Sequence, residues 1–126
     1  LPYVYVRSTP KDHGLENLIE GNLKPGQKVV VIEDLISTGG SSLKAVEAIR
    51  NAGCEVVGMA AIFTYGFPVA VRRFTEAGVK LITLSNYNSM LEAALDTNYI
   101  KPEDLETLKE WRKDPANWTP IRKSDI

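Results

Sequence analysis

The feature that most constrains the fold of this chain is a stretch at residues 29–42, which reads VVVIEDLISTGGSS. Its first four residues are β-branched and apolar, which is typical of a strand buried in a parallel sheet. Two carboxylates, Glu33 and Asp34, come next, and a loop of hydroxyl-bearing residues and glycines follows them. Residues 42–52 then carry apolar side chains at helical spacing, and Gly53 is placed to end that helix. In open α/β sheets, ligands bind where the carboxyl ends of strands meet helix N-termini, so this stretch predicts a binding site.

The loop after the acid pair has the chemistry of a site for a phosphorylated sugar. Glycines allow the backbone to approach an anion, and successive N–H groups can form an anion-binding nest beside the positive end of the helix dipole. Four side chains offer further donors to phosphate oxygens: Ser37, Thr38, Ser41 and Ser42. The carboxylates of Glu33 and Asp34 suit the two hydroxyls of a ribose or a magnesium ion. The loop lacks the Gly-Lys-Ser/Thr of a Walker A loop and the G-x-G-x-x-G spacing of a dinucleotide site.

Together, the apolar strand, the acid pair, two apolar residues and the Ser-Thr-Gly-Gly-Ser run resemble the phosphoribosyl pyrophosphate (PRPP) signature of the type I phosphoribosyltransferases. The resemblance implies an α/β, Rossmann-like fold with a mostly parallel sheet and flanking helices. The alternative is an ordinary strand, turn and helix with two solvated acids. That alternative is disfavoured because adjacent carboxylates at the end of a buried strand are costly without a partner.

Strands and helices are expected to alternate along the chain, which favours a parallel sheet. Strands are predicted at residues 4–7, 28–32, 55–63 and 79–84, and helices at residues 42–52, 68–77, 87–95 and 102–112. Ser85 or Asn86 is expected to cap the third helix. Residues 8–25 are polar and punctuated by glycine and proline, which predicts a long loop of the kind that is usually a functional lid or disordered. The tail from residue 114 onward is expected to pack irregularly.

Length and composition narrow the possibilities further. The chain has 126 residues and is interpreted as a single phosphoribosyltransferase core domain, residues 1–126. Its net charge of −1 gives no basic field for nucleic acid, and no apolar run approaches the roughly 20 residues of a membrane span. The single cysteine, Cys54, is expected in the core, and a cytoplasmic location is expected. Because the sequence opens on a strand-like segment without a Met, it is interpreted as a fragment that lacks the family's N-terminal hood region.

A second motif, Arg-Ser-Thr-Pro-Lys-Asp-His-Gly at residues 7–14, resembles the mobile catalytic loop of orotate phosphoribosyltransferases, typically Arg-Lys-x-x-Lys-x-His-Gly. Residues 61–66, Ala-Ile-Phe-Thr-Tyr-Gly, also resemble a bacterial member of that family. Two positions depart from the pattern. Ser8 stands where the family has its first loop lysine, and Thr64-Tyr65-Gly66 occupies a region where some members carry an arginine for orotate.

The resemblance implies a role for each matching residue. Lys11, His13 and Asp34 are expected to be catalytic. Ser37 is expected to contact orotate. PRPP is expected to be bound by Arg7, Lys11, His13, Glu33, Asp34, Leu35, Ile36, Ser37, Thr38, Gly39, Gly40 and Ser41. In this family the loop reaches into the neighbouring subunit's site, which implies a homodimer, and Mg²⁺ is carried by PRPP rather than held directly by the protein.

The implied reaction joins orotate to PRPP and releases pyrophosphate, giving orotidine 5-monophosphate in pyrimidine synthesis. Two alternatives stay open at this point. One is a purine or uracil phosphoribosyltransferase, against which the Lys-Asp-His-Gly loop argues. The other is a regulator of the same fold that senses PRPP or nucleotides without turning them over. Trp111 and Trp118 are interpreted as packing residues rather than base-stacking platforms, since no basic stripe accompanies them.

Overall fold

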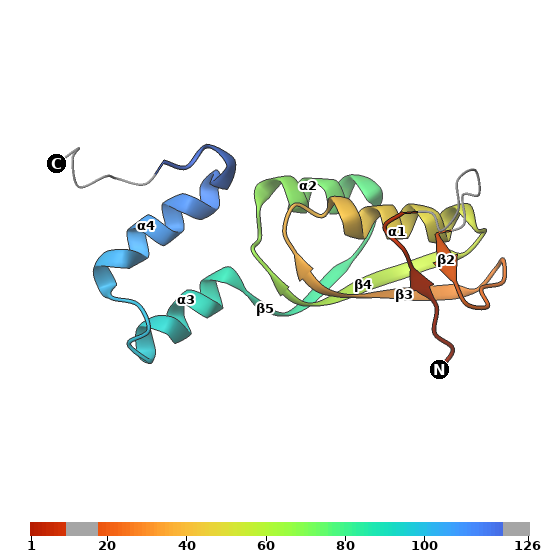
Figure 1. Ribbon diagram of the computed structural model, residues 1–126, viewed down its shortest axis with the longest axis horizontal. Coiled ribbons are helices and arrows are strands. Elements are labelled where there is room, and N and C mark those ends of the chain that lie inside the picture. Colours follow the sequence, from red (N-terminus) through yellow and green to blue (C-terminus); the bar gives the residue numbers. More distant parts are fainter. Residues whose placement is uncertain (10–17, 120–126) are drawn as a thin grey trace.

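The computed structural model describes residues 1–9 and 18–119. Its centre is a parallel three-stranded sheet of β3 (Lys28–Ile36), β4 (Glu55–Thr64) and β5 (Leu81–Asn86), in the order β3-β4-β5. The crossover helices are α1 (Gly40–Asn51) and α2 (Pro68–Ala77), and both pack on the same face of the sheet (Figure 1). Parallel strands joined by helices are what the sequence pattern predicted, so the α/β class is confirmed.

The core lies between the sheet and these two helices. It is formed by side chains that point from the strands toward the helices, together with the apolar faces of the helices: Val31, Val56, Met59, Ala61, Val46, Ile49, Ala70 and Phe74. The buried Cys54 also belongs to this core, and its thiol donates to the carbonyl oxygen of Lys24 at 3.1 Å. Its predicted place in the core is therefore confirmed.

The opposite face of the sheet carries exposed apolar side chains. Along β3, Val31 is 8% exposed whereas Ile32 is 74% exposed. The prediction that this run of valines and isoleucine forms a buried strand is therefore correct for only one face in the described residues. Successive side chains of a strand point to opposite faces, and both crossover helices cover the same one.

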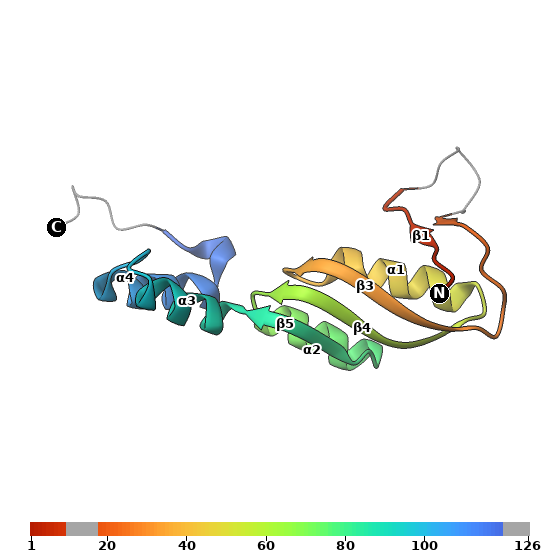
Figure 2. The same ribbon diagram turned by 90° about the horizontal axis from the view of Figure 1, so that it is seen from below.

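A short antiparallel hairpin stem precedes the sheet. It pairs β1 (Tyr5–Val6) with β2 (Ile19–Glu20) and lies beside α1 (Figure 2). The stem continues to Arg7, whose N–H donates to the carbonyl oxygen of Leu18. The prediction of one uninterrupted loop over residues 8–25 is wrong at β2, because the apolar Ile19 packs against the core and is paired with Val6 across the stem.

Beyond the sheet, the chain continues into α3 (Tyr87–Asp96), α4 (Pro102–Lys113) and a 3-10 turn, η1 (Pro115–Asn117) (Figure 1). Asn86 caps α3 by accepting a hydrogen bond from the N–H of Ser89 at 3.0 Å. Of the two predicted caps, Ser85 and Asn86, the structure thus selects Asn86. The tail from residue 114 onward, which was expected to pack irregularly, forms the short turn η1 within its described part, and residues 120–126 lie outside the described residues. No helix among the described residues is both long and apolar enough to span a bilayer.

An aromatic cluster joins α3 and α4 to the carboxyl end of β4. Its members are Phe63, Tyr65, Phe67, Tyr87 and Trp111. Tyr65 and Phe67 stack with ring centroids 5.1 Å apart, and the hydroxyl of Tyr87 donates to the carbonyl oxygen of Leu108 at 2.9 Å. Burial raises the pKa of Tyr87, Arg112 partly opposes that rise, and Tyr65 adds to it. Trp111 is thus a packing residue, as predicted.

Candidate functional site

The candidate site forms where β3 passes into α1. β3 extends to Ile36 and therefore includes both acids, whereas the sequence predicted that it would end before them. A loop at residues 37–39 follows, and α1 begins at Gly40 rather than at the predicted residue 42. Gly39 is the N-cap residue of α1 and has φ 84°, in the left-handed region that favours glycine. The glycine pair thus makes the turn that aims the start of α1 at the carboxyl end of β3.

The first turn of α1 is open to an anion. No side chain hydrogen-bonds to it from the N-cap position, and no acidic residue lies within it. The leading N–H groups of a helix lack partners inside the helix, and they carry its positive dipole end. The backbone at Gly40 and Ser41 therefore supplies donors of the kind that bind phosphate groups. The region from residue 37 to residue 41 is called the phosphate loop below.

Helix α2 supports the phosphate loop from the side. A Cβ built on Gly39 would stand 2.9 Å from Cε2 of Phe74, so the loop backbone lies directly on that ring. Arg73, the neighbour of Phe74, donates from Nη1 to the carbonyl oxygen of Thr38 at 3.0 Å. Sequence reasoning missed both residues, because they lie more than 30 positions away and belong to no local motif.

The acid pair is divided between two environments. Glu33 is half-buried and lines a cavity beside α1. Asp34 is exposed, is not among the residues that line this cavity, and accepts a hydrogen bond from the N–H of Leu35 at 2.7 Å. The difference follows from the strand itself, because successive side chains point to opposite faces.

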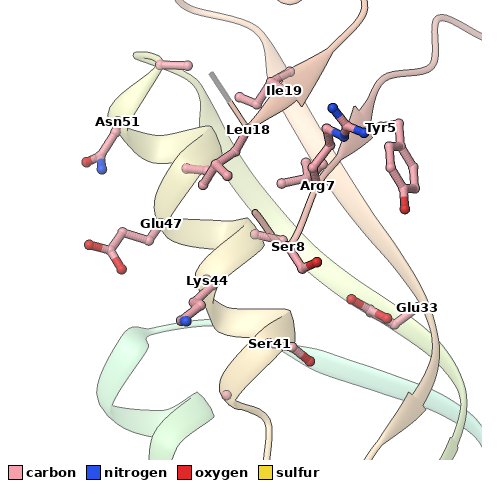
Figure 3. Close-up of a pocket in the computed structure, with 15 residues that line it drawn as sticks. Tyr5, Arg7, Ser8, Leu18, Ile19, Glu33, Ser41, Lys44, Glu47 and Asn51 are labelled. Atoms are coloured by element: carbon pink, nitrogen blue, oxygen red, sulfur yellow. The ribbon is translucent and has the colours of Figure 1, made fainter. Parts of the chain in front are cut away.

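The cavity has a volume of about 1030 Å³ and lies between the β1–β2 hairpin and α1 (Figure 3). Several polar side chains on its wall come from different parts of the chain: Arg7, Ser8, Glu33, Ser41 and Lys44. Of the residues predicted from sequence, the structure thus brings Arg7, Glu33, Gly40 and Ser41 together around this cavity. Lys44 was missed, although it lies within the predicted helix, four residues after Gly40, and lines the same cavity as Ser41.

The position of Arg7 depends on the hairpin stem. Its Nη1 lies 3.4 Å from Oε1 of Glu20, which follows Ile19 on the partner strand. This ion pair spans the base of the segment that carries the Lys-Asp-His-Gly motif. Lys11 and His13 lie outside the described residues.

The other predicted contacts fall in the loop and at the end of β3. Leu35, Ser37 and Thr38 are exposed, and Gly40 lines the cavity. Ile36 is fully buried, and its carbonyl oxygen accepts a hydrogen bond from the N–H of Tyr65 at 3.2 Å. A contact from Ile36 to a ligand would have to come from its backbone.

Comparison with known proteins places this site in a family. The family described as "Phosphoribosyl transferase domain" matches residues 2–96. The orotate phosphoribosyltransferase of Phocaeicola vulgatus is 73% identical over 118 residues, which are 94% of this chain and 56% of that protein. That of Bacteroides fragilis is 72% identical over the same shares. The chain therefore spans about half the length of these curated relatives.

Solved structures agree with this result. UMP synthase of Leishmania donovani matches with a TM-score of 0.71 and 26% identity, over 89% of this chain and 24% of that chain. Orotate phosphoribosyltransferase of Aeropyrum pernix matches with a TM-score of 0.65 and 32% identity, over 73% of this chain and 51% of that one. The enzyme of Mycobacterium tuberculosis in complex with PRPP matches with a TM-score of 0.50 and 36% identity, over 55% and 42% of the two chains. Since the family match covers well over half of its residues and includes β3, the phosphate loop and α1, this chain belongs to the phosphoribosyl transferase domain family.

Proposed function

We propose that this chain carries the PRPP-binding part of an orotate phosphoribosyltransferase. The observation that carries the proposal is the phosphate loop at the open N-terminus of α1, with Glu33 beside it on the wall of the cavity. Relatives that are up to 73% identical over 118 residues are orotate phosphoribosyltransferases, and a structural neighbour was solved in complex with PRPP. The proposed reaction transfers the phosphoribosyl group of PRPP to orotate and releases pyrophosphate, which yields orotidine 5-monophosphate for pyrimidine synthesis.

In the proposed complex, the phosphate loop holds the 5-phosphate. The N–H groups at residues 39–41 and the hydroxyls of Ser37, Thr38 and Ser41 surround three anionic oxygens with donors. Ser37 begins the loop, where its side chain is exposed and free to face a base placed at the ribose. We assign it the contact with orotate on that ground and on the family resemblance.

The two acids hold the ribose in this proposal. Glu33 reaches it from within the cavity, and Asp34 reaches it from the open side of the strand, so the sugar would lie across the end of β3. Carboxylates that accept hydrogen bonds from sugar hydroxyls fix the anomeric carbon relative to the base. Negative charge at this point also favours the positive charge that develops on the ribose as pyrophosphate leaves.

Negative charge develops on the leaving pyrophosphate, and this gives a role to the cations of the hairpin and of α1. Fixed positive charges at the departing oxygens stabilise the transition state more than the ground state. Arg7 and Lys44 line the cavity, and Lys11 and His13 are expected to close over the pyrophosphate. A loop that closes over the site would also exclude water, which would otherwise hydrolyse the activated sugar.

Magnesium fits this arrangement as an ion that arrives with PRPP. The described residues contain no group of three or more His, Cys, Asp or Glu side chains placed to hold a metal. Mg²⁺ commonly binds through substrate phosphates and one or two carboxylates, and Glu33 and Asp34 are the hard oxygen ligands nearest the phosphate loop. When bound, the ion would neutralise charge on the pyrophosphate. We further propose a cytoplasmic homodimer in which the hairpin loop is shared between subunits.

A chimera tests the proposed function. The 118 matched residues of the Phocaeicola vulgatus enzyme are replaced by those of this chain, so that the relative supplies the remainder of its length. With PRPP and Mg²⁺, the chimera is expected to consume orotate, and the same chimera with Asp34→Asn is the control. Consumption of adenine or uracil in preference to orotate would favour another phosphoribosyltransferase. A folded chimera that binds PRPP but turns over no base would favour the alternative of a regulator that senses PRPP or nucleotides.

A further inference from the structure

The phosphate loop receives a hydrogen bond from a residue that belongs to no motif of the site. Arg73 lies on α2, and its Nη1 donates to the carbonyl oxygen of Thr38 at 3.0 Å. The same nitrogen would lie 3.6 Å from a Cβ built on Gly40. One guanidinium group therefore lies against the loop on both sides of Gly39. From this geometry we infer that Arg73 is a positioning residue for the 5-phosphate, an inference that rests on the proposed function.

The bond to Thr38 controls which way the next N–H group points. In a trans peptide the carbonyl of one residue and the N–H of the next point in opposite directions, and the described residues contain no cis peptide bond. When Arg73 holds the carbonyl of Thr38, the N–H of Gly39 must therefore point away from the Arg73 guanidinium. No other hydrogen bond to this carbonyl is found within residues 1–9 and 18–119.

Without such a bond, the orientation of this peptide would be weakly determined. Gly39 has φ 84°, and glycine reaches both signs of φ with similar ease, so the peptide before it can rotate at small cost. An anion-binding nest requires successive N–H groups to point toward the same place. Arg73 selects the orientation before the phosphate arrives, which lowers the ordering that binding would otherwise require.

Arg73 suits this role because its charge is permanent and its donors are held in a rigid plane. Its neighbour Arg72 provides a matched control. Arg72 is exposed on the same helix, carries the same charge, and makes no side-chain hydrogen bond or ion pair within the described residues. A charge effect of α2 as a whole would involve both arginines, whereas the proposed role involves Arg73 alone.

The test compares Arg73→Met, Arg73→Lys and Arg72→Met in the 126-residue chain, with ribose 5-phosphate as the probe and amide NMR as the readout. Arg73→Met is expected to move the Gly39 amide signal before any ligand is added and to weaken binding about tenfold, the effect of one lost hydrogen bond to a charged group. Arg73→Lys should recover part of the affinity, and Arg72→Met should match the parent chain. Since Arg73 is exposed, the dispersion of the other amide signals should be retained in all variants.

The inference fails if Arg73→Met leaves both the Gly39 signal and the affinity unchanged. It also fails if Arg72→Met weakens binding as much as Arg73→Met does, since the effect would then be one of net charge. Failure of the proposed function looks different. In that case the parent chain itself would not bind ribose 5-phosphate, while the Gly39 signal without ligand would still report whether Arg73 orients the peptide.

Discussion

Gly39 of the phosphate loop lies on the aromatic ring of Phe74 in α2, so closely that a Cβ on Gly39 would stand 2.9 Å from Cε2 of that ring. The contact joins the first crossover of the sheet to the second. Position 39 therefore needs a glycine for two separate reasons: the backbone is left-handed, and the Phe74 ring leaves no space for a Cβ.

The same substitution at Gly39 and at Gly26 separates these two reasons. Gly26 also has a left-handed backbone, with φ 87°, but a Cβ added there would meet no atom within 4 Å. Gly39→Ala and Gly26→Ala both carry the cost of a left-handed alanine, about 1–2 kcal/mol. Gly39→Ala is expected to lower the free energy of urea unfolding by about 1–3 kcal/mol more than Gly26→Ala does, because the ring of Phe74 must move. It should also weaken ribose 5-phosphate binding, which Gly26→Ala should not. Equal losses of stability would contradict the contact with Phe74.

The carboxylates can be tested one at a time. Asp34→Asn is expected to weaken PRPP binding roughly tenfold to a hundredfold, because a charge-assisted hydrogen bond contributes about 1.5–3 kcal/mol. Glu33→Gln should weaken it to a similar degree. Glu47→Gln is the control, since Glu47 lines the same cavity farther along α1. Calorimetry with PRPP measures all three. If Asp34→Asn binds PRPP with unchanged affinity, Asp34 is not a residue of the PRPP site.

The hairpin loop makes a prediction about subunits. In the chimera, Lys11→Ala should lower kcat more than it raises KM for PRPP, because its charge is needed most as pyrophosphate leaves. An inactive Lys11→Ala protomer mixed with an inactive Asp34→Ala protomer should recover activity, since a shared site would join an intact Lys11 to an intact Asp34. If mixed dimers form and remain inactive, the loop is not shared between subunits.

Tyr87 predicts a specific dependence of stability on pH. Burial raises its pKa above the ordinary 10.0, so the folded state holds the phenol proton more tightly than the unfolded state does. Its contribution to stability is therefore complete below pH 10 and is lost as the pH rises through the folded-state pKa. Tyr87→Phe should cost about 0.5–1.5 kcal/mol at pH 7, because the hydrogen bond to Leu108 is lost.

The measurement is the free energy of urea unfolding for both proteins between pH 7 and pH 11. The advantage of the parent chain over Tyr87→Phe should narrow above pH 10. Tyr99→Phe is the control, since Tyr99 is 88% exposed and should show no such narrowing. A constant difference between the parent and Tyr87→Phe up to pH 11 would contradict the raised pKa.

Much of the fold could be predicted because its signals are local. Apolar runs and helical spacing located β3, β4, α1 and α2 to within a few residues, and Asn86 was among the predicted caps. The ends of β3 and β5 were less accurate. β3 continues through the acid pair because Glu33, Leu35 and Ile36 all pair with β4, a contact that no local preference reveals.

The candidate site was predictable only where its residues form a motif. The order of strand, acids, glycines and helix located residues 37–41 between β3 and the start of α1, where the structure has them, and their binding of phosphate stays a prediction. Arg73 and Phe74 could not be found this way, since only the packing of α2 beside α1 brings them to the loop. Strand geometry places Glu33 and Asp34 on opposite faces of β3, but which of the two faces the cavity depends on which face the helices cover.

The most direct test of the central claim is an amide NMR titration of the chain with ribose 5-phosphate, and with ribose as the control that lacks the phosphate. We expect ribose 5-phosphate to shift the signals of Gly39, Gly40 and Ser41, ribose to leave them in place, and free orotate to have little effect. Shifts confined to other parts of the chain, or no difference between the phosphorylated and the plain sugar, would contradict a phosphate site at the start of α1.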